Sequence, residues 1–151
     1  MKWVEGGELV ELLQQGHRKV MVLDVRDVDF HGHCVRGAVH IPFASERMDK
    51  VVESIRERVD SEELSDLLVV VHCFYSQQRG PTCARKLEQH LVQGASDLQE
   101  RVTVAVLQGG WGDLWRRFGG TDGEYAPLFR PVTAEEEMGE EEDSEEEVTV
   151  P

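Results

Sequence analysis

The stretch Val69–Arg85 reads VVVHCFYSQQRGPTCAR and combines a strand, a reactive loop and the start of a helix. Its run of three valines is typical of a buried strand. Cys73 follows that run, and five residues separate it from Arg79. Gly80-Pro81 then opens a pattern of apolar residues at helical spacing, because proline is tolerated in a first helical turn. The sequence therefore predicts that Cys73 begins a short loop between a strand and a helix.

Such a loop is suited to holding an oxyanion above a nucleophilic sulfur. Its backbone N–H groups can curl inward as a nest, and the helix that follows adds about half a positive charge at its N-terminus. The planar fork of Arg79 can grip two oxygens of a tetrahedral anion. Thiols in electropositive surroundings react as thiolates, so Cys73 and Arg79 are the predicted catalytic residues. The predicted oxyanion-binding residues are Phe74, Tyr75, Ser76, Gln77, Gln78 and Arg79.

A simpler reading makes Cys73 an inert buried thiol and Arg79 a surface charge. The spacing of cysteine and arginine alone does not exclude it. The valine run and His72 before the loop, and Gly80-Pro81 with a helix after it, favour the reactive site.

Composition excludes several classes of protein. The chain has 151 residues, enough for one domain with a core, and it lacks a run of 18 apolar residues, so we expect no membrane partner. Three irregularly spaced cysteines indicate a reducing compartment, which predicts a cytoplasmic location. His31, His33 and Cys34 crowd into one short loop, so we expect no metal site there.

The net charge of −14 is concentrated at the C-terminus. Residues 134–151 hold ten acidic residues and no basic ones, which leaves 20 acidic and 16 basic residues in the rest of the chain. We therefore expect a catalytic domain over residues 1–130 and an acidic, disordered tail over residues 131–151, of which residues 134–151 should be dispensable. With no basic patch interleaved with aromatic residues, a nucleic-acid partner is disfavoured.

Strand and helix patterns alternate along the chain. Five segments read as strands: Trp3-Val4, Val20–Val25, Gly37–Pro42, Val69–Val71 and Val102–Leu107. Four read as helices: Gly7–Gln15, Met48–Val59 capped by Ser45, Thr82–Leu91 and Trp111–Phe118. This order predicts an α/β domain with a central, mostly parallel five-stranded sheet flanked by helices. The reactive loop follows the fourth strand, at the sheet edge where such folds bind ligands.

Three stretches together resemble the rhodanese-like superfamily. LDVRD (Leu23–Asp27) with GHCVRGAVHIP (Gly32–Pro42), the Cys73 loop, and VLQGGWGDLW (Val106–Trp115) follow the order of the family's motifs. His72-Cys73 and Arg79-Gly80-Pro81 are similar to the branch with an HC-x5-R loop. That branch contains the eukaryotic arsenate/antimonate reductases and the cell-division-cycle dual-specificity phosphatases. The resemblance implies that Cys73 is the nucleophile, Arg79 the oxyanion clamp and Ser76 a hydrogen-bond donor to the thiolate. It implies structural roles for Asp24 and Arg26.

The chain departs from the phosphatases of that branch at two places. Their loops carry acidic residues where this chain has Phe74 and Gln78, so no loop carboxylate can protonate an ester leaving group. Their second, redox cysteine falls at Val25. Cys34 and Cys83 are the remaining candidates for a resolving thiol, and Cys83 fits better as a core residue.

These features lead to a ranked set of functions. The first is a thiol-dependent arsenate reductase, with antimonate as a second substrate, that uses glutathione or a glutaredoxin-like donor and has residual tyrosine-phosphatase activity. Next comes a dual-specificity or tyrosine protein phosphatase, then a sulfurtransferase, and last a non-enzymatic oxyanion-binding module. No bound cofactor is expected.

Overall fold

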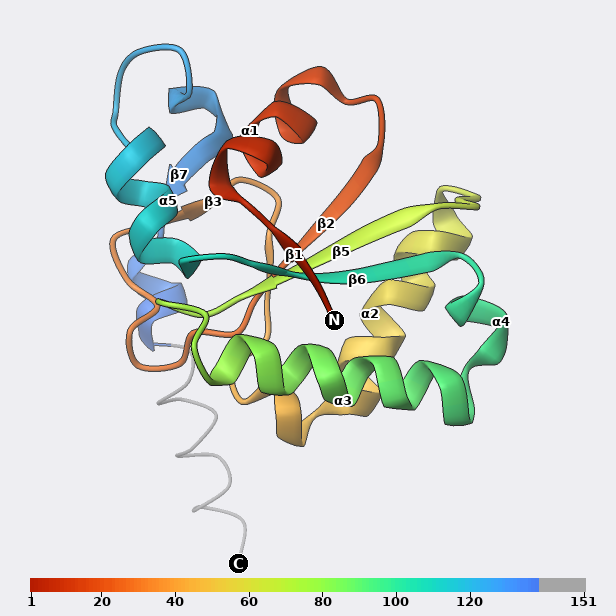
Figure 1. Ribbon diagram of the computed structural model, residues 1–151. Coiled ribbons are helices and arrows are strands. Elements are labelled where there is room, and N and C mark those ends of the chain that lie inside the picture. Colours follow the sequence, from red (N-terminus) through yellow and green to blue (C-terminus); the bar gives the residue numbers. More distant parts are fainter. Residues whose placement is uncertain (139–151) are drawn as a thin grey trace, which may run out of the picture.

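The computed structural model describes residues 1–138 and has one central parallel sheet (Figure 1). Its five strands lie in the order β1-β6-β5-β2-β4, and all four pairings are parallel. The strands are β1 (Lys2–Val4), β2 (Lys19–Asp24), β4 (Val39–His40), β5 (Leu67–His72) and β6 (Val102–Leu107). The predicted fold class is therefore confirmed.

Helices cover both faces of this sheet. Figure 1 shows α1 (Gly6–Gln15) and α5 (Gly110–Phe118) on one face. The other face carries α2 (Met48–Ser61), α3 (Arg79–Gly94) and the short α4 (Ser96–Gln99). Two short 3₁₀ segments, η1 (Ala44–Glu46) and η2 (Ala126–Leu128), and a helical turn over residues 134–138 complete the helical elements of residues 1–138.

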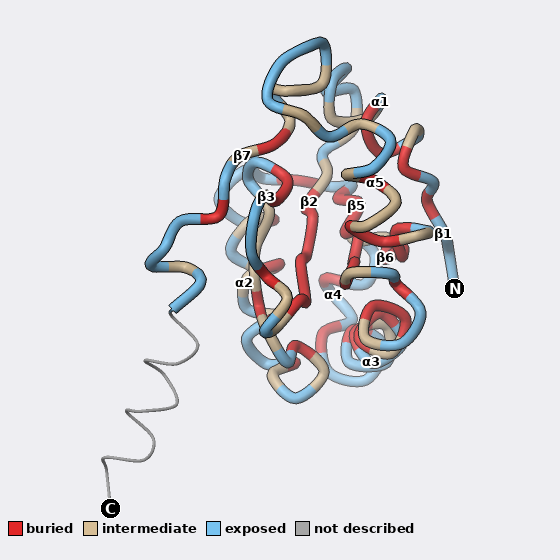
Figure 2. Tube along the Cα trace, turned by 90° about the vertical axis from the view of Figure 1, so that its left-hand side faces the viewer, coloured by how far each residue is buried: buried red, intermediate tan, exposed pale blue. Residues whose placement is uncertain are grey.

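The central strand β5 divides the core because its side chains alternate between the two faces. Val69 and Val71 pack with the α2 and α3 residues, whereas Leu68 and Val70 pack with those of α1 and α5. Every residue of β5 is buried, as Figure 2 shows for this middle layer. Burial on both faces explains the continuous apolar run in the sequence.

A second, smaller sheet was not predicted. Strand β3 (His33–Val35) pairs antiparallel with β7 (Phe129–Pro131), which brings the C-terminal segment beside the loop that follows β2. Both strands have three residues, too few for a period to show in the sequence. The predicted cap of α2 is wrong: Ser45 lies within η1, and Arg47 occupies the N-cap position.

Residues 131–138, which the sequence assigned to the tail, contact the domain. Val132 is buried, and its N–H donates to the carbonyl of Gly32 at 2.8 Å. Thr133 and Glu136 then bond each other's backbone N–H groups, forming a capping box for a short helical turn. The predicted disorder of residues 139–151 lies outside the described residues, and the domain boundary at residue 130 stays a prediction. No helix of the described residues is long and apolar enough to cross a membrane.

Candidate active site

The Cys73 loop connects β5 to α3 at the carboxyl edge of the sheet. Cys73 is almost fully buried, and its sulfur accepts two backbone hydrogen bonds, from Ser76 N at 3.1 Å and from Gly80 N at 3.4 Å. Ser76 has a φ of 56°, in the left-handed region, which turns its amide inward. Both donors point into the loop, towards the sulfur of the predicted nucleophile.

The predicted cradle residues divide by exposure. Tyr75, Gln77 and Gln78 are exposed, Phe74 is half-buried and Ser76 is buried. The Ser76 hydroxyl has no hydrogen-bond partner among the described residues, although it is buried. A buried hydroxyl of this kind can donate to a bound anion or to the thiolate. The structure therefore brings Cys73 and Ser76 together as the floor of the site.

Arg79 is the first residue of α3, and two carboxylates hold its side chain. Nη1 and Nη2 donate to the two oxygens of Asp29 at 2.9 and 2.7 Å, and Nη1 also donates to Asp27 at 3.2 Å. Hydrogen bonding to Asp29 raises the pKa of Arg79. Burial alone would raise the pKa of Asp29, but the hydrogen bond and charge of Arg79 lower it overall.

Sequence reasoning missed these partners of Arg79. The signal was present, because Asp27 and Asp29 follow β2, which pairs directly with β5. The carboxyl ends of neighbouring parallel strands lie at one edge of the sheet, so the loops that follow them meet.

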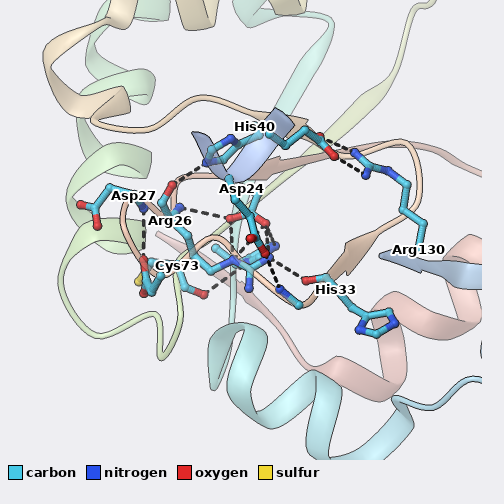
Figure 3. Close-up of polar contacts among 12 residues, drawn as sticks. Asp24, Arg26, Asp27, His33, His40, Cys73 and Arg130 are labelled. Carbon is cyan, nitrogen blue, oxygen red and sulfur yellow. Dashed lines mark hydrogen bonds and ion pairs between the residues drawn. The ribbon is translucent and has the colours of Figure 1, made fainter. Parts of the chain in front are cut away.

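Behind the loop lies a buried polar network, shown in Figure 3. Arg26 donates to Asp24 from Nη2 at 2.8 Å and from Nε at 3.1 Å, and both side chains are fully buried. Burial tends to raise the pKa of Asp24, yet the charges of His72 and Arg26 lower it overall. The guanidinium of Arg26 lies over the rings of Phe30 and Trp111, 5.1 and 4.6 Å from their centroids. These contacts fit the structural roles expected for Asp24 and Arg26.

The network is joined to the nucleophile through the backbone. Nδ1–H of His72 donates to the carbonyl of Cys73 at 3.0 Å, and Nε2 of His72 lies 3.6 Å from an Asp24 oxygen. The same Cys73 carbonyl accepts a hydrogen bond from Trp111 N at 3.0 Å, at the start of α5. Three elements, β2, β5 and α5, thus fix where the loop begins.

Neither remaining cysteine is presented to solvent. Cys34 lies on β3 in a small cluster with Phe30 and Val132, and burial raises the pKa of its thiol. Cys83 belongs to the core beneath α3, where burial raises its pKa to about 12. Both thiols are free and fully buried, an environment that does not favour a resolving role for either.

An aromatic groove lies beside the loop. We use this name for the hollow lined by Phe74, Tyr75, Gln77, Gly109, Trp111, Gly112, Asp113, Trp115 and Arg116. Tyr75 is 64% exposed at its rim, and the rings of Phe74 and Tyr75 meet edge to face. On the other side, Arg79 lines a smaller recess with Asp27 and Glu46.

Comparison with known proteins assigns this architecture. The rhodanese-like domain family matches residues 6–116, which include the Cys73 loop and both motifs that flank it. The chain belongs to the rhodanese-like domain family. The resemblance inferred from the sequence is confirmed.

Individual relatives of this rhodanese-like chain carry two kinds of name. This chain is 30% identical to the dual specificity phosphatase ibp1 of Schizosaccharomyces pombe, and the match covers 82% of this chain and 94% of ibp1. It is 23% identical to arsenical-resistance protein 2 of Saccharomyces cerevisiae over 74% of this chain and 85% of that one. Among solved structures, the yeast protein tyrosine phosphatase Ygr203w has 29% identity and a TM-score of 0.64, with 78% of this chain and 86% of that chain covered. The relatives support a cysteine-dependent enzyme of this family.

Proposed function

We propose that this rhodanese-like enzyme is a thiol-dependent arsenate reductase with weak phosphatase activity. The observation that carries the proposal is a loop with a nucleophile and a clamp but without an acid. Cys73 and Arg79 are in place, whereas positions 74 and 78 hold Phe74 and Gln78. Arsenical-resistance protein 2 among the relatives supports the same choice.

Two nearby carboxylates, Asp29 and Asp113, are poorly suited to replace the missing acid. Both oxygens of Asp29 accept hydrogen bonds from Arg79, and its pKa is lowered. Asp113, beside the aromatic groove, is held by Arg116 and Arg117, whose hydrogen bonds lower its pKa. A carboxylate that stays ionised at neutral pH is a poor proton donor for an ester oxygen.

Arsenate reduction does not need that donor. The Cys73 thiolate would attack arsenic(V), form a sulfur–arsenic bond and expel a hydroxide, which takes its proton from solvent. A glutathione or glutaredoxin-like thiol would then attack the Cys73 sulfur. The sulfur–arsenic electron pair stays with arsenic, which leaves as arsenic(III), and a second thiol reduces the mixed disulfide. Two thiols thus supply the two electrons that arsenic gains. Antimonate would follow the same course.

A protein phosphatase is the second candidate, because ibp1 and Ygr203w carry that name. Phosphate and arsenate have the same shape and charge, so the cradle alone does not separate the two functions. The aromatic groove beside the loop would give a phosphoprotein substrate an apolar surface to contact.

One paired assay tests the choice. Wild type and Gln78→Glu are compared with arsenate plus glutathione and with phosphotyrosine-like esters of good and poor leaving groups. We expect wild type to reduce arsenate and to cleave poor leaving groups slowly. A carboxyl group at position 78 should raise hydrolysis of the poor leaving groups by about 10²-fold, the contribution of a general acid, without raising arsenate reduction. If wild type hydrolyses poor and good leaving groups equally fast and leaves arsenate unreduced, the phosphatase takes first place.

A further inference from the structure

The clamp arginine of the proposed oxyanion site is already occupied by carboxylates of the same chain. We propose that Asp29, assisted by Asp27, competes with the oxyanion for Arg79, so that a ligand must displace this pair before the arginine can bind it. This inference rests on the proposed function, since it assumes that the Cys73 loop binds an oxyanion.

The contacts are those that an oxyanion would use. Asp29 takes one N–H from each terminal nitrogen of Arg79, at 2.9 and 2.7 Å, and Asp27 takes another from Nη1 at 3.2 Å. Paired donation to two oxygens is how a guanidinium holds phosphate-like anions. In this position Arg79 faces two negative charges with its single positive one, and its side chain is 39% exposed.

The carboxylates are held in place by their own turn. Asp27 N donates to Asp29 Oδ1 at 3.1 Å, and Val28 N donates to Asp27 Oδ1 at 2.6 Å. Phe30, which is buried, anchors the far end of the turn, while Arg26 is buried at its near end. The turn therefore presents both carboxylates toward α3 before any ligand arrives, and the cost of ordering them is already met by folding.

Competition of this kind sets both affinity and selectivity. Apparent affinity falls in proportion to the fraction of molecules whose arginine is available. A singly charged anion offers Arg79 less negative charge than the Asp27 and Asp29 carboxylates together, whereas a doubly charged oxyanion matches the charge of the pair. The carboxylate pair thus makes the site selective for dianions such as arsenate or a phosphate monoester.

Binding of sodium sulfate to the full-length protein tests the inference without chemistry at Cys73. We expect calorimetry at pH 7 and constant ionic strength to show that Asp29→Asn binds sulfate about tenfold more tightly than wild type. Asp27→Asn, which neutralises the carboxylate that makes the single longer contact, should show a smaller gain. Asp66→Asn is the matched control: Asp66 makes a two-point pair with Arg18 at 3.0 and 3.1 Å, and its loss should leave sulfate affinity unchanged.

A double-variant cycle shows whether the gain passes through Arg79. In an Arg79→Lys background, Asp29→Asn should no longer raise affinity by the same factor, because lysine lacks the fork. Thermal unfolding of each variant checks that the fold is kept. If wild type binds sulfate and folded Asp29→Asn binds it equally or more weakly, the inference is overturned and the proposed function stands. If neither protein binds sulfate or arsenate, the proposed function fails, and this inference with it.

Discussion

Arg26 lies 2.8 Å from Asp24 with both side chains wholly removed from solvent. Breaking a buried pair leaves an uncompensated charge in the interior, so removal of one partner is costly. We expect Asp24→Asn to lower the free energy of unfolding by about 3–5 kcal/mol, measured by urea denaturation. The exposed Arg18–Asp66 pair provides the contrast, since Asp66→Asn should cost about 1 kcal/mol or less. Equal decreases in the free energy of unfolding for Asp24→Asn and Asp66→Asn would show that burial does not strengthen the contribution of the Asp24–Arg26 pair.

Cys73 should be the thiol that reacts first. Two amides direct their hydrogens at its sulfur, whereas burial raises the thiol pKa of Cys34 and of Cys83. Iodoacetamide at pH 7 should label Cys73 about tenfold faster than Cys34 or Cys83. Mass spectrometry of the digested peptides measures the three labelling rates. Cys73→Ser should remove this fast phase and all turnover while the melting temperature holds. Labelling at one common rate would contradict the assignment.

Glu136 links pH to stability. The hydrogen bond from Arg130 lowers the pKa of Glu136 to about 2, so its charged form stabilises the fold above its ordinary pKa. That contribution is lost as pH falls from about 4.5 towards 2. Glu136→Gln should cost about 1 kcal/mol at pH 7, and the difference from wild type should shrink on acidification.

The control for this experiment is Glu135→Gln, which removes the same charge one position away on the same helical turn. Its unfolding curves should follow those of wild type at each pH. A Glu136→Gln deficit that is constant from pH 7 to pH 2 would show that the ion pair is not its source.

Two truncations test how much of the acidic C-terminal segment stabilises the domain. Removing residues 139–151 should leave melting temperature and turnover unchanged, because a segment this rich in acidic residues has little apolar surface to bury. Removing residues 133–151 also deletes the capping box and the Arg130 ion pair, which should cost about 1–2 kcal/mol. Differential scanning fluorimetry of both truncated proteins gives the melting temperatures to be compared. Equal stability of the two truncations would restore the simpler expectation of a tail dispensable from residue 134.

The sequence predicted an element well when the element was long and its apolar residues recurred with a clear period. The valine-rich β5 and the amphipathic α3 were readable because burial on two faces or on one stripe leaves a repeating pattern. The pairing of β3 with β7 was not, since it joins three-residue strands far apart in the chain. Cys73 and Arg79 followed from local spacing. The Arg79–Asp29 pair depends on which strands are neighbours and on how the segment after β2 meets the start of α3, so local spacing alone does not predict it.

The start of α5 has one practical consequence. Trp111 donates its backbone N–H to Cys73 O, and its ring stacks on Trp115 at 5.4 Å between centroids. A Cβ atom at Gly110 would lie 2.5 Å from the Phe74 carbonyl oxygen. Only glycine at this position therefore lets the start of α5 pack this closely against the loop. Indole emission reports such a contact directly. Trp3, half exposed on β1, supplies a constant background. A ligand that shifts the loop against α5 should therefore change the indole fluorescence, and no attached dye is needed to measure it.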